Sequence, residues 1–205
     1  MSAPETKEQE ESSNTGSIEL IIGPMFGGKS SEMISRVRRA THAMQAGCII
    51  KFKGDDRYEH GDTVSTHDDV RQSSTPGTDM VAPIRVISAA TLSEVDVTEP
   101  VIGVDEGQFY PDLLECCEAW ARDGHRVIIA ALDGDFNRKP FGQVCQLIPL
   151  CEKIVKQQGV CMACRTHDSA FTQRLWSGSD SVIKIGGNES YRSVCRKCYF
   201  DSGTS

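Results

Sequence analysis

Short apolar runs alternate with amphipathic stretches along most of this chain. The first run, Ile-Glu-Leu-Ile-Ile at residues 18–22, is rich in β-branched residues and ends at Gly23, which predicts a strand. Apolar residues then recur three and four positions apart, so we predict a helix over residues 29–46. Gly47 suits the C-terminus of this helix, because glycine readily adopts the left-handed conformation in which many helices end.

The alternation continues through the middle of the chain. A helix is predicted at residues 111–123, before Gly124, and further strands at residues 48–52, 84–87, 101–104 and 127–131. The last of these strands is apolar throughout, which is typical of a parallel strand covered on both faces. Strands that alternate with helices predict an α/β fold, in which a parallel sheet with right-handed crossovers gathers its ligands at the carboxyl ends of the strands.

Both ends of the chain differ from this pattern. Residues 1–17 have almost no large apolar side chain, so we expect a disordered N-terminal tail. From Cys161 onward Cys, Gly, Ser and Arg dominate, and we expect only short strands, near Phe171 and at residues 181–185. The predicted units are the tail at residues 1–17, an α/β domain at 18–158, a small metal-binding domain at 159–200 and a C-terminal tail at 201–205.

Composition restricts the class of protein. The 205 residues, 39% hydrophobic and 25% charged, can form one medium core with a small appendage. No run approaches the about 20 apolar residues that span a membrane. The N-terminal segment is acidic and lacks the basic start and apolar middle of a signal peptide, so we expect a cytoplasmic protein without a membrane partner. The net charge of -7 argues against binding to a nucleic-acid polymer, which needs a basic surface, but it is compatible with binding a mononucleotide.

The loop after the first predicted strand carries the motif G-x-x-x-x-G-K-S before a predicted helix, which is the context expected of a phosphate-binding loop. Small residues let backbone N–H groups surround phosphate oxygens at a helix N-terminus, where the helix dipole also favours an anion. We expect Lys29 to contact the β and γ phosphates of ATP and the Ser30 hydroxyl to bind Mg²⁺. The alternative is a glycine-rich turn with an ordinary surface lysine. The motif comprises Gly23, Pro24, Met25, Phe26, Gly27, Gly28, Lys29 and Ser30.

Two acidic residues, Asp105 and Glu106, follow the predicted strand at residues 101–104. In a parallel sheet wound in this way, that strand end lies beside the phosphate loop. Adjacent residues at the end of an extended strand point in opposite directions. We therefore assign Asp105 to Mg²⁺, directly or through its water, and Glu106 to the acceptor as general base. The alternative is a solvated acidic turn.

Four of the nine cysteines form two Cys-x-x-Cys pairs, each of which can place two thiolates on one tetrahedral metal ion. Zinc is the expected metal, and disulfides or separate redox motifs are the alternatives. Because four thiolates complete the tetrahedron, we expect His167 to be a loop residue. The predicted ligands are Cys161, Cys164, Cys195 and Cys198. The remaining cysteines lie in apolar stretches and are expected to be small buried hydrophobes: Cys48, Cys116, Cys117, Cys145 and Cys151.

Thirty residues separate the two cysteine pairs, more than the ~15 to 20 usual in zinc ribbons. The metal would then tie together the ends of a long loop, which includes Phe171, Thr172, residues 185–187 and Tyr191. These residues suit the enclosure of a flat ligand, and they suit the packing of a small domain equally well.

Together these motifs resemble the cellular-type (type II) thymidine kinase family. The resemblance extends from about Ile18 to Phe200. It rests on Gly-Pro-Met-Phe-x-Gly-Lys-Ser at 23–30, Asp-Glu-Gly-Gln-Phe at 105–109, Ala-Ala-Leu-Asp-Gly-x-Phe at 130–136, Arg-Lys-Pro-Phe at 138–141 and Ser-Val-Cys-Arg-x-Cys-Tyr-Phe at 193–200. It implies a RecA-like parallel sheet core with a phosphate loop (P-loop) and a small C-terminal zinc-binding lasso domain. It also implies a homotetramer that transfers the γ-phosphate of ATP to the 5′-hydroxyl of thymidine in nucleotide salvage for DNA synthesis, accepts deoxyuridine and is inhibited by thymidine triphosphate.

The resemblance further implies roles for individual residues. Glu106 corresponds to the catalytic base, and the four paired cysteines correspond to the zinc ligands. The nucleotide and magnesium contacts outside the phosphate loop correspond to Asp55, Asp56, Arg57, Asp105 and Gln108. The thymidine site corresponds to Phe136, Phe141, Thr172, Val182, Ile183, Lys184, Ile185, Gly186 and Tyr191. Gly27 stands where many relatives have serine, a change that leaves phosphate binding by backbone groups intact.

The strongest rival from another class is a nucleic-acid-directed ATPase with a zinc ribbon. The sequence has neither a basic, aromatic-rich stripe for a single strand nor a second motor domain, which favours the kinase. A structural zinc protein with a relic nucleotide site is disfavoured, because the lysine and serine of the phosphate loop and both acidic residues are all present.

Overall fold

The computed structural model describes residues 15–54, 82–175 and 190–201. Its centre is a six-stranded sheet in the order β3-β2-β4-β5-β1-β6, and every neighbouring pair is parallel. The α/β parallel fold expected from the sequence is therefore confirmed. The strands are β1 (Ser17–Ile22), β2 (Gly47–Phe52), β3 (Ile84–Ala89), β4 (Val101–Val104), β5 (Arg126–Ala131) and β6 (Lys153–Lys156).

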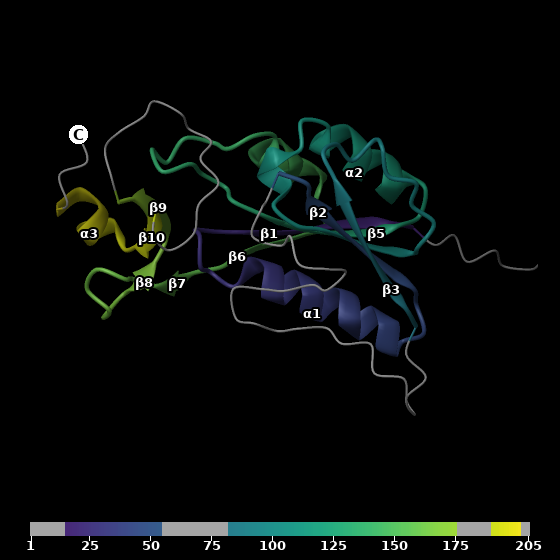
Figure 1. Ribbon diagram of the computed structural model, residues 1–205, viewed down its shortest axis with the longest axis horizontal. Helices are drawn as coiled ribbons and strands as arrows, with labels where there is room; N and C mark the ends of the chain where they lie inside the picture. The colour runs from purple at the N-terminus through teal and green to yellow at the C-terminus, as the bar shows by residue number, and fades with distance from the viewer. Residues whose placement is uncertain (1–14, 55–81, 176–189, 202–205) are drawn as a thin grey trace, which may run out of the picture.

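Helices cover both faces of the sheet (Figure 1). The helix α1 (Lys29–His42) lies on one face, and α2 (Leu113–Arg122) lies on the other together with the 3-10 helix η3 (Val144–Leu150). No helix in the described part of the chain is both long enough and apolar enough to cross a membrane.

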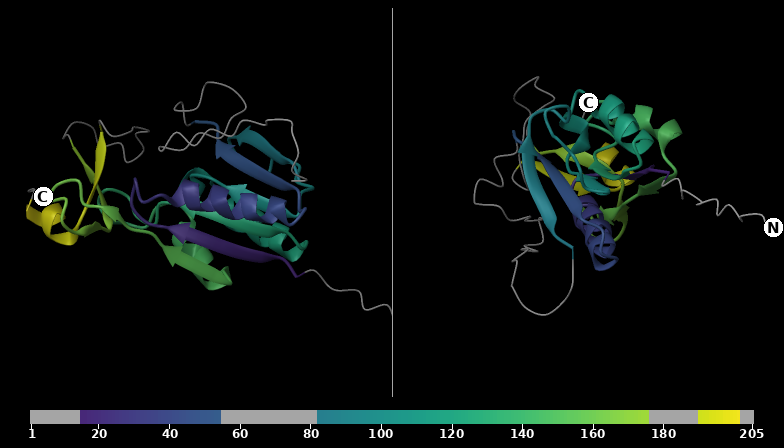
Figure 2. Two further views of the ribbon diagram at one scale, coloured as in Figure 1. Left: turned by 90° about the horizontal axis from the view of Figure 1, so that it is seen from below. Right: turned by 90° about the vertical axis from the view of Figure 1, so that its right-hand side faces the viewer.

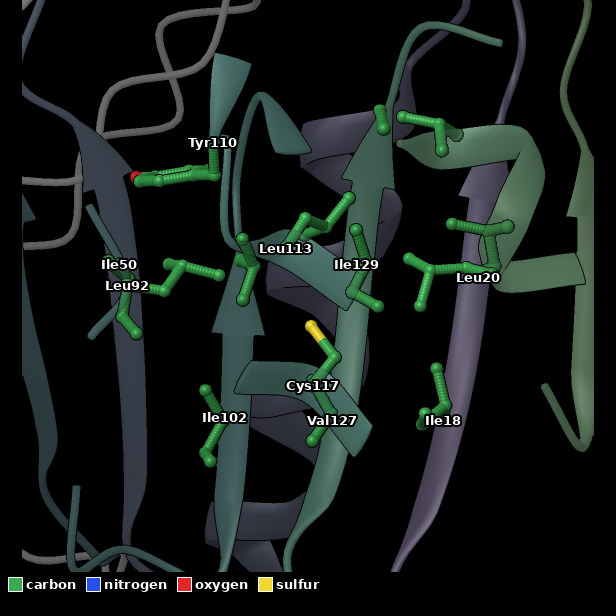
Figure 3. Close-up of a cluster of buried hydrophobic side chains, with 14 of the residues drawn as sticks. Ile18, Leu20, Ile50, Leu92, Ile102, Tyr110, Leu113, Cys117, Val127 and Ile129 are labelled. Atoms are coloured by element: carbon green, nitrogen blue, oxygen red, sulfur yellow. The ribbon is translucent and has the colours of Figure 1, made fainter. Parts of the chain in front are cut away.

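Side-chain alternation along the strands gives the sheet a core on each face. In β1, Ile21 packs in the cluster beneath α1, whereas Leu20 belongs to the cluster on the α2 face. Figure 3 shows this second cluster, in which Leu113 and Cys117 of α2 lie over Ile129 and the other buried strand residues. Because both faces are covered, the central strands are apolar almost throughout, as expected.

The structure corrects the predicted end of the first helix. The helix α1 ends at His42 rather than at residue 46, because Met44 adopts the left-handed conformation (φ 61°) and Gln45 N–H donates to the carbonyl of Ala40. Gly47 does not end the helix but begins β2, where a Cβ would lie 2.9 Å from Val37 Cγ1 of α1. This glycine therefore permits close packing of α1 on the sheet.

The strand β6 was not predicted from the sequence. Its apolar pair, Ile154 and Val155, stands between two lysines, and β6 is an edge strand that pairs with β1. So short a run carries no period of its own, and its place in the sheet is fixed by pairing with the buried β1.

A small unit with the paired cysteines lies at one end of the sheet, as the two views in Figure 2 and the view in Figure 1 show. We call it the cysteine unit (residues 159–175 and 190–201). Its elements are β7 (Gly159–Val160), β8 (Asp168–Ser169), β9 (Phe171–Arg174), β10 (Tyr191–Val194) and α3 (Arg196–Asp201). The strand expected near Phe171 is confirmed as β9, which pairs antiparallel with β10. The strand expected at 181–185 and most of the predicted N-terminal tail lie outside the described residues.

Candidate active site

The glycine-rich loop joins β1 to α1 at the carboxyl edge of the sheet, as the motif predicted. Gly28 caps α1 with φ 75°, a conformation that strains residues with a Cβ. Gly23 has φ 139°, and a Cβ there would lie 2.4 Å from the carbonyl oxygen of Gln157, just beyond β6. The glycines therefore let the loop turn sharply and pack directly against the neighbouring strand end.

Two polar side chains of the motif make the contacts that close the loop. The Lys29 ammonium group is buried and donates a 2.7 Å hydrogen bond to the carbonyl of Pro24, across the loop. The Ser30 hydroxyl donates a 2.6 Å hydrogen bond to Asp105 Oδ1 at the end of β4. The structure thus brings the serine of the glycine-rich loop and the strand-end carboxylate together, as the sheet topology predicted.

Asp105 is only 5% exposed, and its Oδ1 also accepts a hydrogen bond from the backbone N–H of Glu106. Burial and then the nearby charge of Glu106 raise the pKa of Asp105 to about 6, against the opposing effects of the Ser30 hydrogen bond and Lys29. A hydroxyl and a carboxylate are the oxygen ligands that Mg²⁺ prefers. A bound cation would favour the ionised carboxylate, so this pair fits a magnesium site.

The backbone of Glu106 differs from the extended conformation expected at a strand end. It is not extended but left-handed (φ 53°, ψ 43°), and it turns the chain into the 3-10 helix η2 (Gly107–Phe109). A non-glycine residue in this conformation is uncommon and needs surrounding contacts to hold it. Here Gln108 Nε2 donates a 2.6 Å hydrogen bond to Glu106 Oε2, while Gln108 Oε1 accepts one of 2.9 Å from Leu132 N–H. The half-buried Glu106 carboxylate is thereby fixed in direction.

A hairpin-like loop at residues 133–141 follows β5 and carries two of the predicted thymidine-site residues. Asp135 Oδ1 stabilises it by accepting 2.8 Å hydrogen bonds from the backbone N–H groups of Asn137 and Lys139. At the end of the loop the rings of Phe141 and Phe109 pack edge to face, with centroids 5.6 Å apart. Phe109 is the last residue of η2, the turn that Glu106 begins. The loop therefore joins the surroundings of the proposed base to the cysteine unit.

Hydrogen-bond and cation–π contacts hold this loop against the cysteine unit. The Tyr199 hydroxyl donates a 2.7 Å hydrogen bond to the carbonyl of Phe136. The Arg174 guanidinium lies 4.7 Å from the centroid of the Phe136 ring. The Arg138 guanidinium lies 4.6 Å from the centroids of both Tyr199 and Phe200, which is cation–π geometry. Arg174 and Tyr199 were not among the predicted site residues, and the only sequence signal for Tyr199 was its place in the last motif of the resemblance.

The four predicted metal ligands converge. The Sγ atoms of Cys161, Cys164, Cys195 and Cys198 all lie within 4.8 Å of one another, and all nine cysteines are free thiols. A tetrahedral zinc site with Zn–S bonds of about 2.3 Å would bring these sulfurs to about 3.8 Å separation, so small side-chain movements would complete it. His167 lies outside this set of four but contacts it, with Nδ1 3.4 Å from Cys164 Sγ.

Contacts within the cluster shift the pKa values of these thiols in opposite directions. A hydrogen bond from Thr166 leads the contributions that lower the pKa of Cys164 to about 5, whereas the pKa of Cys198 is raised to about 12, first because its thiol donates to Cys195. Thiolates this close repel one another, so ionisation of all four requires a compensating divalent ion. The cluster can hold a metal ion, and its chemistry is consistent with zinc.

The other predicted site residues are only partly described. Thr172 and Tyr191 are buried in the antiparallel strands β9 and β10. Asp55, Asp56 and Arg57 lie outside the described residues, as do Val182, Ile183, Lys184, Ile185 and Gly186. The sequence did not indicate Gln157, whose Cβ lies 3.8 Å from the position a Cβ would take at Gly27. No motif marks Gln157, because its place beside the loop depends on the unpredicted strand β6.

A serine hydroxyl bonded to a buried carboxylate at the head of a helix is suited to holding phosphate and its metal ion, which is typical of α/β proteins that bind nucleoside phosphates. Comparison with known proteins identifies the family. The family model described as thymidine kinase matches residues 16–199. Thymidine kinases of monkeypox virus, vaccinia virus (strain Western Reserve) and variola virus are each 46% identical to the chain over 190 residues, covering 92% of this chain and 99% of each relative. The chain belongs to the thymidine kinase family and is an enzyme, a phosphotransferase.

Proposed function

We propose that this enzyme transfers the γ-phosphate of ATP to the 5′-hydroxyl of thymidine, with deoxyuridine as a second acceptor. The observation that carries this proposal is a run of contacts from Ser30 through Asp105 to Glu106, ending at Gln108. It joins the loop suited to phosphate with a carboxylate suited to accept a proton. Such an arrangement serves transfer from a nucleotide to an alcohol.

The phosphate side of the site is the loop at residues 23–30. Backbone N–H groups and Lys29 would hold the β and γ phosphates, with Lys29 moving from the carbonyl of Pro24. Ser30 and Asp105 would hold Mg²⁺, which when bound neutralises charge on the phosphates. We assign Asp55, Asp56 and Arg57 to further nucleotide contacts on the strength of the family resemblance.

On the acceptor side, Glu106 takes the proton from the 5′-hydroxyl of the nucleoside. At the same time the oxygen of that hydroxyl forms a bond to the γ-phosphorus. The bond from that phosphorus to the β–γ bridging oxygen breaks, ADP leaves, and the proton later passes from Glu106 to solvent. Gln108 acts as a positioning residue, because its carboxamide bridges Glu106 and Leu132 N–H. The nucleoside site would be lined by Phe136, Phe141, Thr172, Tyr191 and residues 182–186.

The family resemblance supports several finer proposals. We assign a structural zinc ion to the four-cysteine cluster, whose sulfur atoms are already gathered. We also propose a homotetramer, inhibition by thymidine triphosphate, a cytoplasmic location and a role in nucleotide salvage. The division into an α/β domain (18–158) and a zinc-binding lasso domain (159–200) belongs to the same proposal.

A phosphate-transfer assay with ATP, Mg²⁺ and a panel of deoxynucleosides tests the function. We expect ADP release that depends on thymidine, with thymidine monophosphate as the product and weaker turnover of purine nucleosides. ADP release that needs no nucleoside and is stimulated by DNA would instead support the rival ATPase. Light scattering of the purified protein tests the tetramer.

A further inference from the structure

The phosphate loop is bonded to the cysteine unit. The backbone N–H of Met25 donates a 3.0 Å hydrogen bond to Thr172 Oγ1, although the two residues are separated by 147 positions. Thr172 is only 6% exposed, so little water competes for this contact. A side chain that the resemblance places in the thymidine site therefore supports the loop that would bind ATP.

A second contact lies at the next residue of the loop. Gly159, the first residue of β7, lies so close to the loop that a Cβ there would be 2.9 Å from the carbonyl oxygen of Phe26. Phe26 itself has φ 60°, a conformation that costs a non-glycine residue free energy and persists only when neighbours enforce it. The cysteine unit supplies two such neighbours. The Thr172 hydroxyl accepts from Met25 N–H, and the backbone of Gly159 lies against the carbonyl of Phe26.

The position of Thr172 is coupled to the cysteines through the strands that carry it. Thr172 of β9 pairs with Ser193 of β10, two residues before Cys195. Ser193 in turn donates from its hydroxyl to the carbonyl of Val160, and its own carbonyl accepts from Met162 N–H, between Cys161 and Cys164. The hydroxyl of Thr172 is thus held by the same small sheet that gathers the metal ligands.

From this geometry we propose that Thr172 is a positioning residue for the phosphate loop. Its hydroxyl holds Met25 N–H and thereby keeps the loop in the conformation that binds nucleotide, so that nucleotide affinity depends on this one hydroxyl of the cysteine unit. This role is separate from any contact with the nucleoside. It rests on the proposed function in one respect, namely that the loop binds ATP.

The test compares Thr172→Val, which keeps the shape and removes the hydroxyl, with Thr172→Ser, which keeps the hydroxyl. Affinity for a non-hydrolysable ATP analogue with Mg²⁺ is measured by calorimetry without any nucleoside. Hydrogen exchange at the Met25 amide is measured in the free protein. We expect Thr172→Val to bind the analogue about fivefold more weakly, the effect of one net hydrogen bond, and to exchange the Met25 amide faster. Thr172→Ser should match the wild type in both measurements.

Tyr199→Phe is the matched control, because it removes another hydroxyl of the cysteine unit, one that bonds to Phe136 and not to the phosphate loop. It should leave analogue affinity and Met25 exchange unchanged. Equal weakening by Tyr199→Phe would mean general loosening of the unit and would overturn the proposal, as would wild-type behaviour of Thr172→Val. If Val is not accommodated at this position, Thr172→Ala provides the same comparison. If the wild type itself fails to bind the analogue, the proposed function fails, and Met25 exchange alone decides the role of Thr172.

Discussion

Gln108 Nε2 donates a 2.6 Å hydrogen bond to the Glu106 carboxylate, and Gln108 Oε1 accepts one from the backbone N–H of Leu132, the residue that follows β5. Gln108 is almost completely buried, so this carboxamide has a fixed orientation. The direction of the Glu106 side chain is therefore set by the sheet rather than by solvent. The catalysis that we propose for Glu106 should accordingly be sensitive both to the chemistry of its carboxylate and to the packing around Gln108.

Glu106→Gln tests the chemistry. We expect nucleotide binding to survive and turnover to fall by about 10²- to 10⁴-fold, because the amide keeps the shape but cannot accept the proton. Single-turnover transfer to thymidine and calorimetric titration with ATP separate the two effects. Turnover near that of the wild type would remove Glu106 from the role of general base.

Gly142→Ala tests the packing. Gly142 has φ 54°, and a Cβ there would lie 2.4 Å from the carbonyl oxygen of Gln108, so alanine must displace the η2 turn. We expect lower stability by about 1–3 kcal/mol and a loss of turnover that exceeds any loss of ATP affinity. Gly134→Ala is the control in the same part of the chain, because its Cβ would meet nothing closer than 3.5 Å. Equal kinetics for the two variants would argue against positioning through Gln108.

Glu19→Gln tests a buried ion cluster beneath α1. The Glu19 carboxylate contacts Arg36 at 2.7 Å and also pairs with Arg126. We expect the free energy of unfolding at neutral pH to fall by about 2–4 kcal/mol, somewhat less than for a fully buried pair because Arg126 is partly exposed. Glu99→Gln, which removes the more exposed pair with Arg85, should cost less than about 1 kcal/mol.

The same cluster predicts a pH dependence. Burial alone would raise the pKa of Glu19, but hydrogen bonds and charges of Arg126 and Arg36 outweigh it and lower the pKa below its ordinary value of 4.5. A lowered folded-state pKa gives stability that is present above the unfolded-state pKa and is lost as pH falls through the folded-state value. The stability difference between the wild type and Glu19→Gln should therefore shrink below about pH 4. Denaturant unfolding from pH 7 to pH 3 measures it, and a constant difference would contradict the assignment.

Cys195→Ser tests the metal cluster. Removing one of four gathered thiols should lower the zinc content and the melting temperature, because metal-binding energy in so small a unit is also folding energy. Cys116→Ser, outside the cluster on α2, should change neither the zinc content nor the melting temperature to a comparable degree. Elemental analysis and thermal melting give the comparison. Full zinc content in the Cys195 variant would show that this residue is not a ligand.

The sequence by itself determined the features that depend on neighbours in the chain. Apolar periodicity predicted the central strands and both main helices, and Gly124 was correctly placed at the end of α2, where it has φ 92°. The phosphate-loop motif and the cysteine pairs are also local patterns, so their residues could be named before any fold was known. Each of these features is fixed mainly by backbone preference or by residue spacing.

The tertiary structure alone decided how those pieces meet. It assigned Gly47 to a strand, added β6, turned Glu106 into a left-handed conformation and bonded Met25 to Thr172. None of these leaves a periodic signal, because each depends on a contact with another element of the fold. These contacts are the close approach of Val37 on α1, the pairing with β1, the Leu132 N–H that holds Gln108 and through it Glu106, and the hydroxyl of Thr172. Packing at such contacts can override local preference, since burying a polar group or a side chain without its partner costs more free energy than an unusual backbone conformation at one residue.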